Sequence, residues 1–74
     1  MNIKRVLGDN IRYIRQKRGM TLDDLSILSK MSRTFISDIE RSEKAATVTS
    51  IEKIAKALKV TPAMLLTPEA YKTI

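Results

Sequence analysis

Four polar side chains, Arg33, Thr34, Ser37 and Asp38, occupy positions that would lie together on one exposed face of a short helix. An arginine guanidinium can donate two parallel hydrogen bonds to O6 and N7 of a guanine, which discriminates against other bases by roughly 1–3 kcal/mol. The hydroxyl groups of Thr34 and Ser37 can bond to bases or phosphates, and the Asp38 carboxylate can accept from a cytosine amino group. If the helix that carries them is presented to the major groove of DNA, these groups can meet base edges there, with Arg33 as the main reader.

Other roles remain open for residues of this segment. Arg33 could contact a phosphate or solvent instead, although an arginine at a helix start gains nothing from the helix dipole and needs an anion or an acceptor. Asp38 could pair with a nearby Lys or Arg and never reach DNA. Phe35, the only phenylalanine, could press on a sugar or a thymine methyl, or it could pack over the loop that follows the helix, and packing is favoured.

The residues between positions 21 and 41 have the apolar spacing of two short helices that meet at a steep angle. Leu25 and Leu28 form one apolar pair, and Ile36 and Ile39 form a second, so each helix offers one narrow apolar stripe. Two such stripes that face each other form a corner between the helices.

The ends of both short helices carry capping residues. Thr21 with Asp24 three residues later predicts a capping box for the first helix, and Ser32 can cap the second by accepting a backbone N–H. The turn between them then spans about residues 29 to 32. A connection of this length lets the second helix lie in a major groove, so the sequence predicts a helix-turn-helix.

The order of residues over about positions 5 to 66 resembles the Cro and phage-repressor-like (Xre-type) helix-turn-helix family. The resemblance implies an all-α, compact five-helix lambda-repressor-like domain and a sequence-specific DNA-binding transcriptional regulator. The segment from Arg33 to Ser37 is also similar to controller proteins of restriction-modification systems, and Thr21-Leu22 to sporulation and biofilm regulators. The likeness is carried by Arg15, Gly19, Leu25, Ser32, Ile36, Ser37, Ile39, Glu40 and the run from Ile51 to Val60.

The same resemblance places the end of the first helix against the end of the recognition helix. It thereby implies an internal ion pair between Arg15 and Glu40 that would orient the recognition helix. Both side chains could instead point to water, where such a pair contributes less than about 1 kcal/mol.

Three residues depart from the family pattern. Leu22 stands where the family usually has a Gln that touches a phosphate or braces the recognition helix. Lys30 stands where the family usually has a Gly in a left-handed turn, a conformation that costs other residues on the order of 1 kcal/mol. Ser26 replaces a small Ala, and its hydroxyl is expected to bond back to its own helix.

The rest of the chain predicts helices only, because alternation with period two never persists beyond a few residues. Residues 1–66 should form the helix-turn-helix domain, and residues 67–74 a tail or a short segment that contacts a dimer partner. Gly19 should stop the first helix in a left-handed conformation. The expected helices are about 3–17, 22–29 and 33–41, a fourth capped by Thr47 or Thr49 and continuing through Leu58, and a short fifth after Thr61.

Polar and basic residues around the recognition helix are candidates for holding the DNA backbone without reading sequence. The lysines at 53, 56 and 59 are expected to form a solvated face instead. The candidate backbone contacts are Thr21, Ser32, Phe35, Arg41, Ser42 and Lys44.

Composition limits the possible functions of these 74 residues. The 14 basic and 8 acidic residues give a net charge of +6, which favours a polyanionic partner. Cys and His are absent, so thiolate metal sites and the commonest acid-base residue are missing, and neither an enzyme nor a bound cofactor is expected. No apolar run has the length of a signal peptide or a membrane span, so a cytoplasmic location in a bacterial host is expected.

One domain of this size covers only about six base pairs, so we expect a homodimer on a pseudo-palindromic operator with half-sites one helical turn apart. Val60 and Leu65 should close the core, whereas Met64, Leu66 and Tyr71 should contact the partner subunit. Repression needs only the operator, while activation would add a contact with RNA polymerase. The alternative is an antitoxin or adaptor whose main role is to bind a small protein partner.

Overall fold

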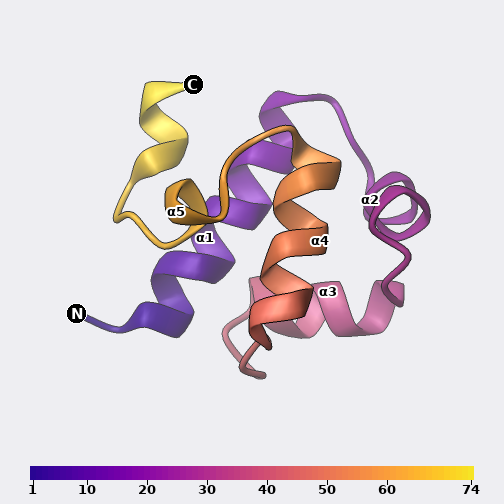
Figure 1. Cartoon of the computed structure of the whole chain (residues 1–74), viewed down its shortest axis with the longest axis horizontal. Coiled ribbons are helices and arrows are strands. Elements are labelled where there is room, and N and C mark those ends of the chain that lie inside the picture. Colours follow the sequence, from indigo (N-terminus) through magenta and orange to yellow (C-terminus); the bar gives the residue numbers. More distant parts are fainter.

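The computed structural model describes residues 1–74 as a bundle of α-helices that ends in a 3₁₀ turn, with no strand. The predicted all-α, five-helix architecture is confirmed, and the first two helices have the predicted bounds. Figure 1 shows α4 crossing in front of α1, with α2 and α3 to the right and α5 and the C-terminal turn to the left. The elements are α1 (Ile3–Lys17), α2 (Leu22–Ser29), α3 (Arg33–Glu40), α4 (Val48–Leu58), α5 (Pro62–Leu65) and the 3₁₀ helix η1 (Ala70–Thr73).

Every α-helix contributes side chains to one core. Helix α1 supplies three of them at helical spacing and α4 another three, so these two long helices form most of the interior. The buried apolar residues are Leu7, Ile11, Ile14, Leu25, Ile36, Ile39, Ile54, Ala55, Leu58 and Leu65.

The prediction that Leu28 pairs with Leu25 in the interior was wrong, because Leu28 is 62% exposed. The inward stripe of α2 runs through Leu22, Leu25 and Ser29, so that Leu28 falls on the outer surface. Ser29 is buried because its hydroxyl donates to the Leu25 carbonyl at 2.6 Å, which satisfies the polar group inside the helix.

The predicted caps and the left-handed turn are confirmed. The Thr21 hydroxyl accepts from the Asp24 N–H at 3.0 Å, and the Asp24 carboxylate accepts from the Thr21 N–H at 2.9 Å. Ser32 caps α3 by accepting from the Phe35 N–H at 3.1 Å. Lys30 adopts the left-handed conformation with φ 58°, so the turn keeps its shape without glycine.

The hydroxyl of Ser26 does not bond back to its own helix as we expected. It donates to the Met31 carbonyl at 2.6 Å, across the turn that follows α2. The left-handed Lys30 reverses the chain there, which brings the next carbonyl over the last turn of α2. Ser26 therefore braces the turn between the two helices.

Helices α1 and α3 approach each other closely at Gly8. A Cβ atom at this position would lie 2.6 Å from the Ile39 carbonyl oxygen and 2.8 Å from that of Glu40. A glycine inside a helix costs about 1 kcal/mol relative to alanine, so its presence here is explained by this backbone contact. The contact seats the C-terminal end of α3 directly on α1.

The last residues fold back over α1, where Asn10 is fully buried. Its Oδ1 atom accepts from the Tyr71 N–H at 3.2 Å, and the Tyr71 ring lies 4.8 Å from the Tyr13 ring, centroid to centroid. Tyr71, predicted to contact a partner subunit, is thus half-buried in its own chain. The amide nitrogen of Asn10 donates to the carbonyls of Met64 at 3.2 Å, Leu65 at 3.0 Å and Thr67 at 2.8 Å.

Replacing Asn10 with alanine should release this C-terminal segment and lower the free energy of unfolding by about 2–3 kcal/mol, because the buried Leu65 carbonyl, the partly buried Met64 and Thr67 carbonyls and the Tyr71 N–H all lose the bond to this side chain. Urea unfolding measures the loss, and amide exchange at Tyr71 should accelerate. The Gln16→Ala variant, on an exposed part of the same helix, should change stability little. Equal unfolding midpoints for the two variants would contradict the role of Asn10.

Candidate nucleic-acid interface

Helix α3 is held along one side and exposed at its start. Ile36 and Ile39 are buried in the core, whereas the Arg33 side chain is 63% exposed and Thr34 is also exposed. Ser37, one turn later, is half-buried. Of the predicted base readers, Arg33 and Thr34 are thus exposed at the helix start, and Ser37 and Asp38 are half-buried behind them.

Arg33 makes one interaction within the protein. Its Nη1 atom lies 2.9 Å from Asp23 Oδ1 at the start of α2, and the Asp23 side chain is 67% exposed. Ion pairs in such exposed positions contribute about 0.2–1 kcal/mol, so a phosphate or a guanine can displace the carboxylate. Asp23 therefore holds the guanidinium near the start of α3 without occupying it permanently.

Asp38 is part of a cluster of charges at the end of α3. Its carboxylate accepts from Arg41 Nη2 at 2.7 Å and lies 3.4 Å from Lys44 Nζ. The hydrogen bond from Arg41, with a smaller contribution from Lys44, lowers the pKa of the Asp38 carboxyl below its usual range. The structure thus has the arrangement that the sequence left as an alternative, with Asp38 paired to nearby basic residues.

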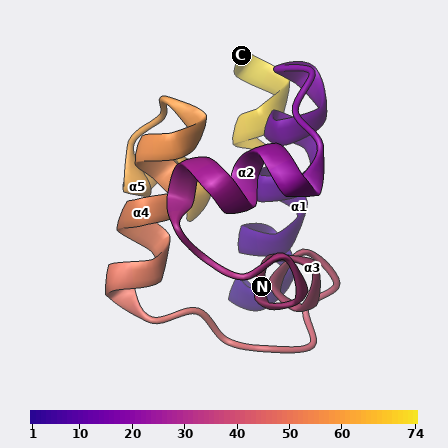
Figure 2. The ribbon, with the colours of Figure 1, turned by 90° about the vertical axis from the view of Figure 1, so that its right-hand side faces the viewer.

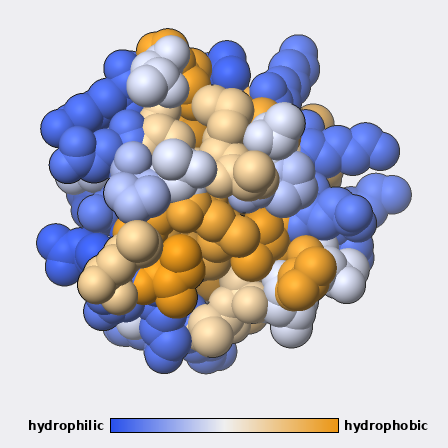
Figure 3. Space-filling view, turned by 60° about the vertical axis from the view of Figure 1, so that its left-hand side comes forward, coloured by the Kyte–Doolittle hydropathy of each residue, from blue (hydrophilic) through white to orange (hydrophobic).

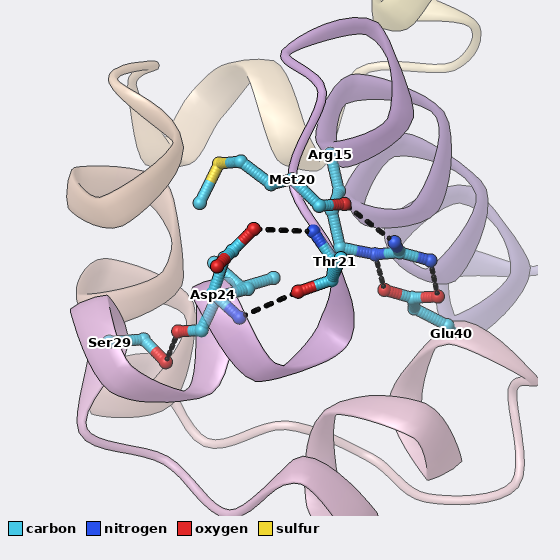
Figure 4. A network of polar contacts seen from close by, with 7 residues as sticks. Arg15, Met20, Thr21, Asp24, Ser29 and Glu40 are labelled. Carbon is cyan, nitrogen blue, oxygen red and sulfur yellow. Dashed lines mark hydrogen bonds and ion pairs between the residues drawn. The ribbon is translucent and has the colours of Figure 1, made fainter.

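The structure brings Arg15 and Glu40 together as predicted. Arg15 Nε donates to Glu40 Oε2 at 2.8 Å and Nη2 donates to Oε1 at 3.0 Å, and the side chains are only 11% and 6% exposed (Figure 4). Arg15 Nη1 also donates to the Met20 carbonyl at 2.9 Å, just before Thr21 caps α2. One guanidinium therefore joins the end of α1, the start of α2 and the end of α3.

The comparisons with known proteins agree with this geometry. A family model described as helix-turn-helix (HTH_3) matches residues 11–65. The chain belongs to the Cro/C1-type helix-turn-helix family. It is therefore a DNA-binding transcriptional regulator and not an enzyme, and the resemblance seen in the sequence is confirmed.

Three relatives show the extent of the likeness. The chain is 42% identical to control protein C.BamHI from Bacillus amyloliquefaciens over 66 residues. The matched region covers 88% of this chain and 82% of C.BamHI. The crystal structure of the hypothetical transcription factor NHTF from Neisseria matches with a TM-score of 0.89 at 30% identity, over 97% of this chain and 83% of that one. The restriction-modification controller protein C.Esp1396I was crystallised as a tetramer with its natural 35 base-pair operator. Its structure matches with a TM-score of 0.80 at 35% identity, over 88% of this chain and 86% of the C.Esp1396I chain.

The remaining candidates for DNA backbone contact surround the helix-turn-helix. Thr21 and Ser32 are exposed although their hydroxyls cap α2 and α3. Phe35 is half-buried and packs against the core. Ser42 has φ 61°, and its hydroxyl is turned toward the Lys4 carbonyl at 3.4 Å.

Three residues of this region were not found from the sequence. Asp23, the partner of Arg33, lies ten positions before it and on another helix, so no local pattern pairs the two. Gly8 lies against the end of α3, and the Met20 carbonyl accepts from Arg15 just before α2 begins. No local sequence pattern predicts either contact. A glycine in the middle of an otherwise strong helix was the one available signal for Gly8.

The structure has neither a candidate metal site nor a candidate membrane-spanning helix. No group of three or more acidic, histidine or cysteine side chains could hold a metal ion. None of the helices has the length and apolar character that crossing a membrane requires.

Replacing Lys44 with alanine should reduce the slope of log affinity against log salt concentration by about 0.9, because one phosphate contact is lost. Lys44 is 57% exposed beside α3, and its only carboxylate partner is Asp38. Fluorescence anisotropy over a salt series measures the slope, with Lys53→Ala on α4 as the matched control. A Lys44 variant with an unchanged slope would show that this lysine does not touch a phosphate.

Proposed function

We propose that this regulator binds a pseudo-palindromic operator as a homodimer, with α3 of each subunit in the major groove. The observation that carries the proposal is the exposed start of α3, where Arg33 is held only by an exposed ion pair, on a helix whose far end is held by the buried Arg15–Glu40 pair. A rigidly mounted helix with an exposed arginine at its start meets the geometric requirement for base recognition.

Within this proposal the residues around α3 have different roles. Arg33 and Thr34 read base edges, and Ser37 follows them one turn deeper in the groove. Asp38 holds the side chains of Arg41 and Lys44 toward the phosphates, rather than reading a cytosine itself. Thr21, Ser32 and Ser42 complete the contacts with the DNA backbone, whereas Phe35 packs against the core of its own domain.

The proposed dimer surface lies around α5. Leu66 is 39% exposed and Met64 is half-buried beside it. Figure 3, which brings the left-hand side of Figure 1 forward, shows a continuous apolar area ringed by hydrophilic side chains. Burial of such an area against a second copy would remove it from water and place two recognition helices on one face of DNA.

The likeness to C.BamHI and C.Esp1396I supports a narrower role as a restriction-modification controller protein. Such a protein acts in the bacterial cytoplasm, where its operator lies, by occupying or flanking a promoter. Occupancy alone suffices for repression, whereas activation adds a contact with RNA polymerase. Two dimers on adjacent sites would give a tetramer like that of C.Esp1396I on its operator.

Selection of bound duplexes from a random DNA pool tests this proposal, together with sedimentation of the protein on the selected duplex. We expect a two-fold symmetric motif with half-sites about 10 base pairs apart, centre to centre, and two subunits on each motif. The variant Leu66→Glu should bind the same motif with lower affinity, and its dimer should be partly dissociated. Recovery of no motif, or of a single asymmetric site with one subunit, would refute operator binding by a dimer.

A further inference from the structure

The positive charge of the molecule is concentrated away from α3. Five basic residues that have no carboxylate within ion-pair distance surround the exposed Leu28, and we name this group the basic face. These five residues contribute +5, while the other nine basic residues of the chain nearly balance its eight acidic residues in number. The basic face consists of Leu28 with Arg18, Lys30, Lys53, Lys56 and Lys59.

The basic face has an apolar centre. Leu28 lines two adjoining hollows together with Ala57, and the basic side chains stand around them. A leucine that is 62% exposed keeps most of its side chain in water although no part of the helix-turn-helix uses it. Single exposed apolar side chains are common on protein surfaces, but Leu28 lines both hollows at the centre of a ring of basic side chains.

The basic face is also separate from the DNA-reading surface. Helix α2 packs against both α3 and α4, and in Figure 2 its C-terminal end lies beside α4 while α3 is on the other side of the view. Lys30, in its left-handed conformation, ends α2 on this side. A ligand can therefore occupy the basic face while α3 lies in the groove.

The chemistry of the face distinguishes between possible occupants. A second copy of this chain would bring like charges together, which is unfavourable. A duplex would satisfy the lysines, but the backbone that it presents to them is phosphate and sugar, which covers Leu28 less well than an apolar side chain does. An acidic segment with an apolar side chain satisfies both, since its carboxylates face the basic rim and its apolar group covers Leu28 and Ala57.

We infer that the basic face docks an acidic amphipathic segment of a partner protein, while the recognition helix is free to bind DNA. This inference goes beyond operator binding and does not depend on it. It also gives a role to the exposed Leu28 of α2, which stands among basic residues without ion-pair partners.

A titration with a designed peptide tests the inference. The isotopically labelled full-length protein is titrated, with NMR detection, with a helical peptide that has glutamates on one face and leucines on the other. A control peptide has serine in place of each leucine. The leucine peptide should bind about tenfold or more tightly than the serine peptide and shift the amides around Leu28 and Lys56.

Variants of the protein sharpen this test. The substitutions Leu28→Ser and Lys56→Glu should each lower the affinity for the leucine peptide by about tenfold. Because neither residue is buried, both variants should fold. The matched controls are Val48→Ser, at an 84% exposed valine, and Lys4→Glu, at a lysine outside the face, and both should bind the peptide normally.

Other outcomes would overturn the inference. Equal binding of the two peptides, or normal binding by Leu28→Ser, would show that the face attracts charge without recognising a segment. Shifts confined to α3 would place the peptide in the DNA groove, and displacement from the basic face by a random-sequence duplex would make it a second DNA site. Operator binding by Leu28→Ser is measured in parallel, so failure of the proposed function is seen separately.

Discussion

Replacement of Arg33 by alanine should weaken binding to the selected operator by about 1–3 kcal/mol for each half-site and relax the preference for one guanine in each. The reason is geometric: the Arg33 side chain is 63% exposed at the start of α3, and its only partner is an equally exposed carboxylate. Selection from a random pool, run side by side on wild type and variant at one salt concentration, measures both effects.

The partner of Arg33 supplies the control. Asp23→Ala removes the ion pair but leaves the guanidinium in place, so it should keep the same motif and bind with equal or slightly higher affinity. If Arg33→Ala instead weakens all sequences equally and leaves the motif unchanged, then Arg33 holds a phosphate. Base reading would then have to come from Thr34 and Ser37.

The features that could be predicted from the sequence depend on neighbours within one or two helical turns. The capping box of Thr21 and Asp24, the Ser32 cap and the left-handed Lys30 all belong to this kind, and all are present. Local hydrogen bonds and backbone propensities determine them before any tertiary contact forms. The bounds of α1 and α2 followed from the same signals.

The features that were missed depend on contacts between distant parts of the chain. Asn10 bonds to groups 54 to 61 positions away, so nothing near it in the sequence shows that a polar residue will be fully buried. Gly8 is explained only by the backbone of α3 against it. The prediction for Leu28 was wrong for a different reason. Leu25 and Leu28 fit an apolar stripe, but Ser29 is the residue that lies buried beside Leu25.

The candidate site shows the same division. The residue types at 33, 34, 37 and 38 indicated DNA recognition without a structure, but their environments differ. Asp38 is paired mainly with Arg41, three positions further along the chain, and its second contact depends on how the loop after α3, which turns through a left-handed Ser42, places Lys44. Polar residues in a pattern can therefore be assigned to a surface from sequence, while their individual roles require the geometry.

Replacement of Glu40 by alanine should destabilise the fold by about 3–5 kcal/mol, because it leaves the Arg15 guanidinium unpaired at a site where the side chain is only 11% exposed. For a domain of this size that loss is a large part of the total stability, so the thermal midpoint should fall by more than about 10 °C. Thermal and urea unfolding measure the change, with Glu43→Ala, at an exposed ion pair, as the control.

A double variant separates the loss of a partner from the loss of the pair itself. Replacing Arg15 with methionine and Glu40 with leucine removes both charges, and we expect much of the stability to return, because no buried charge is left unpaired. Operator affinity should recover less, because the pair also joins α1 and α2 to the end of the recognition helix. If Glu40→Ala costs less than about 1 kcal/mol, the pair behaves as an exposed one and cannot be what orients α3.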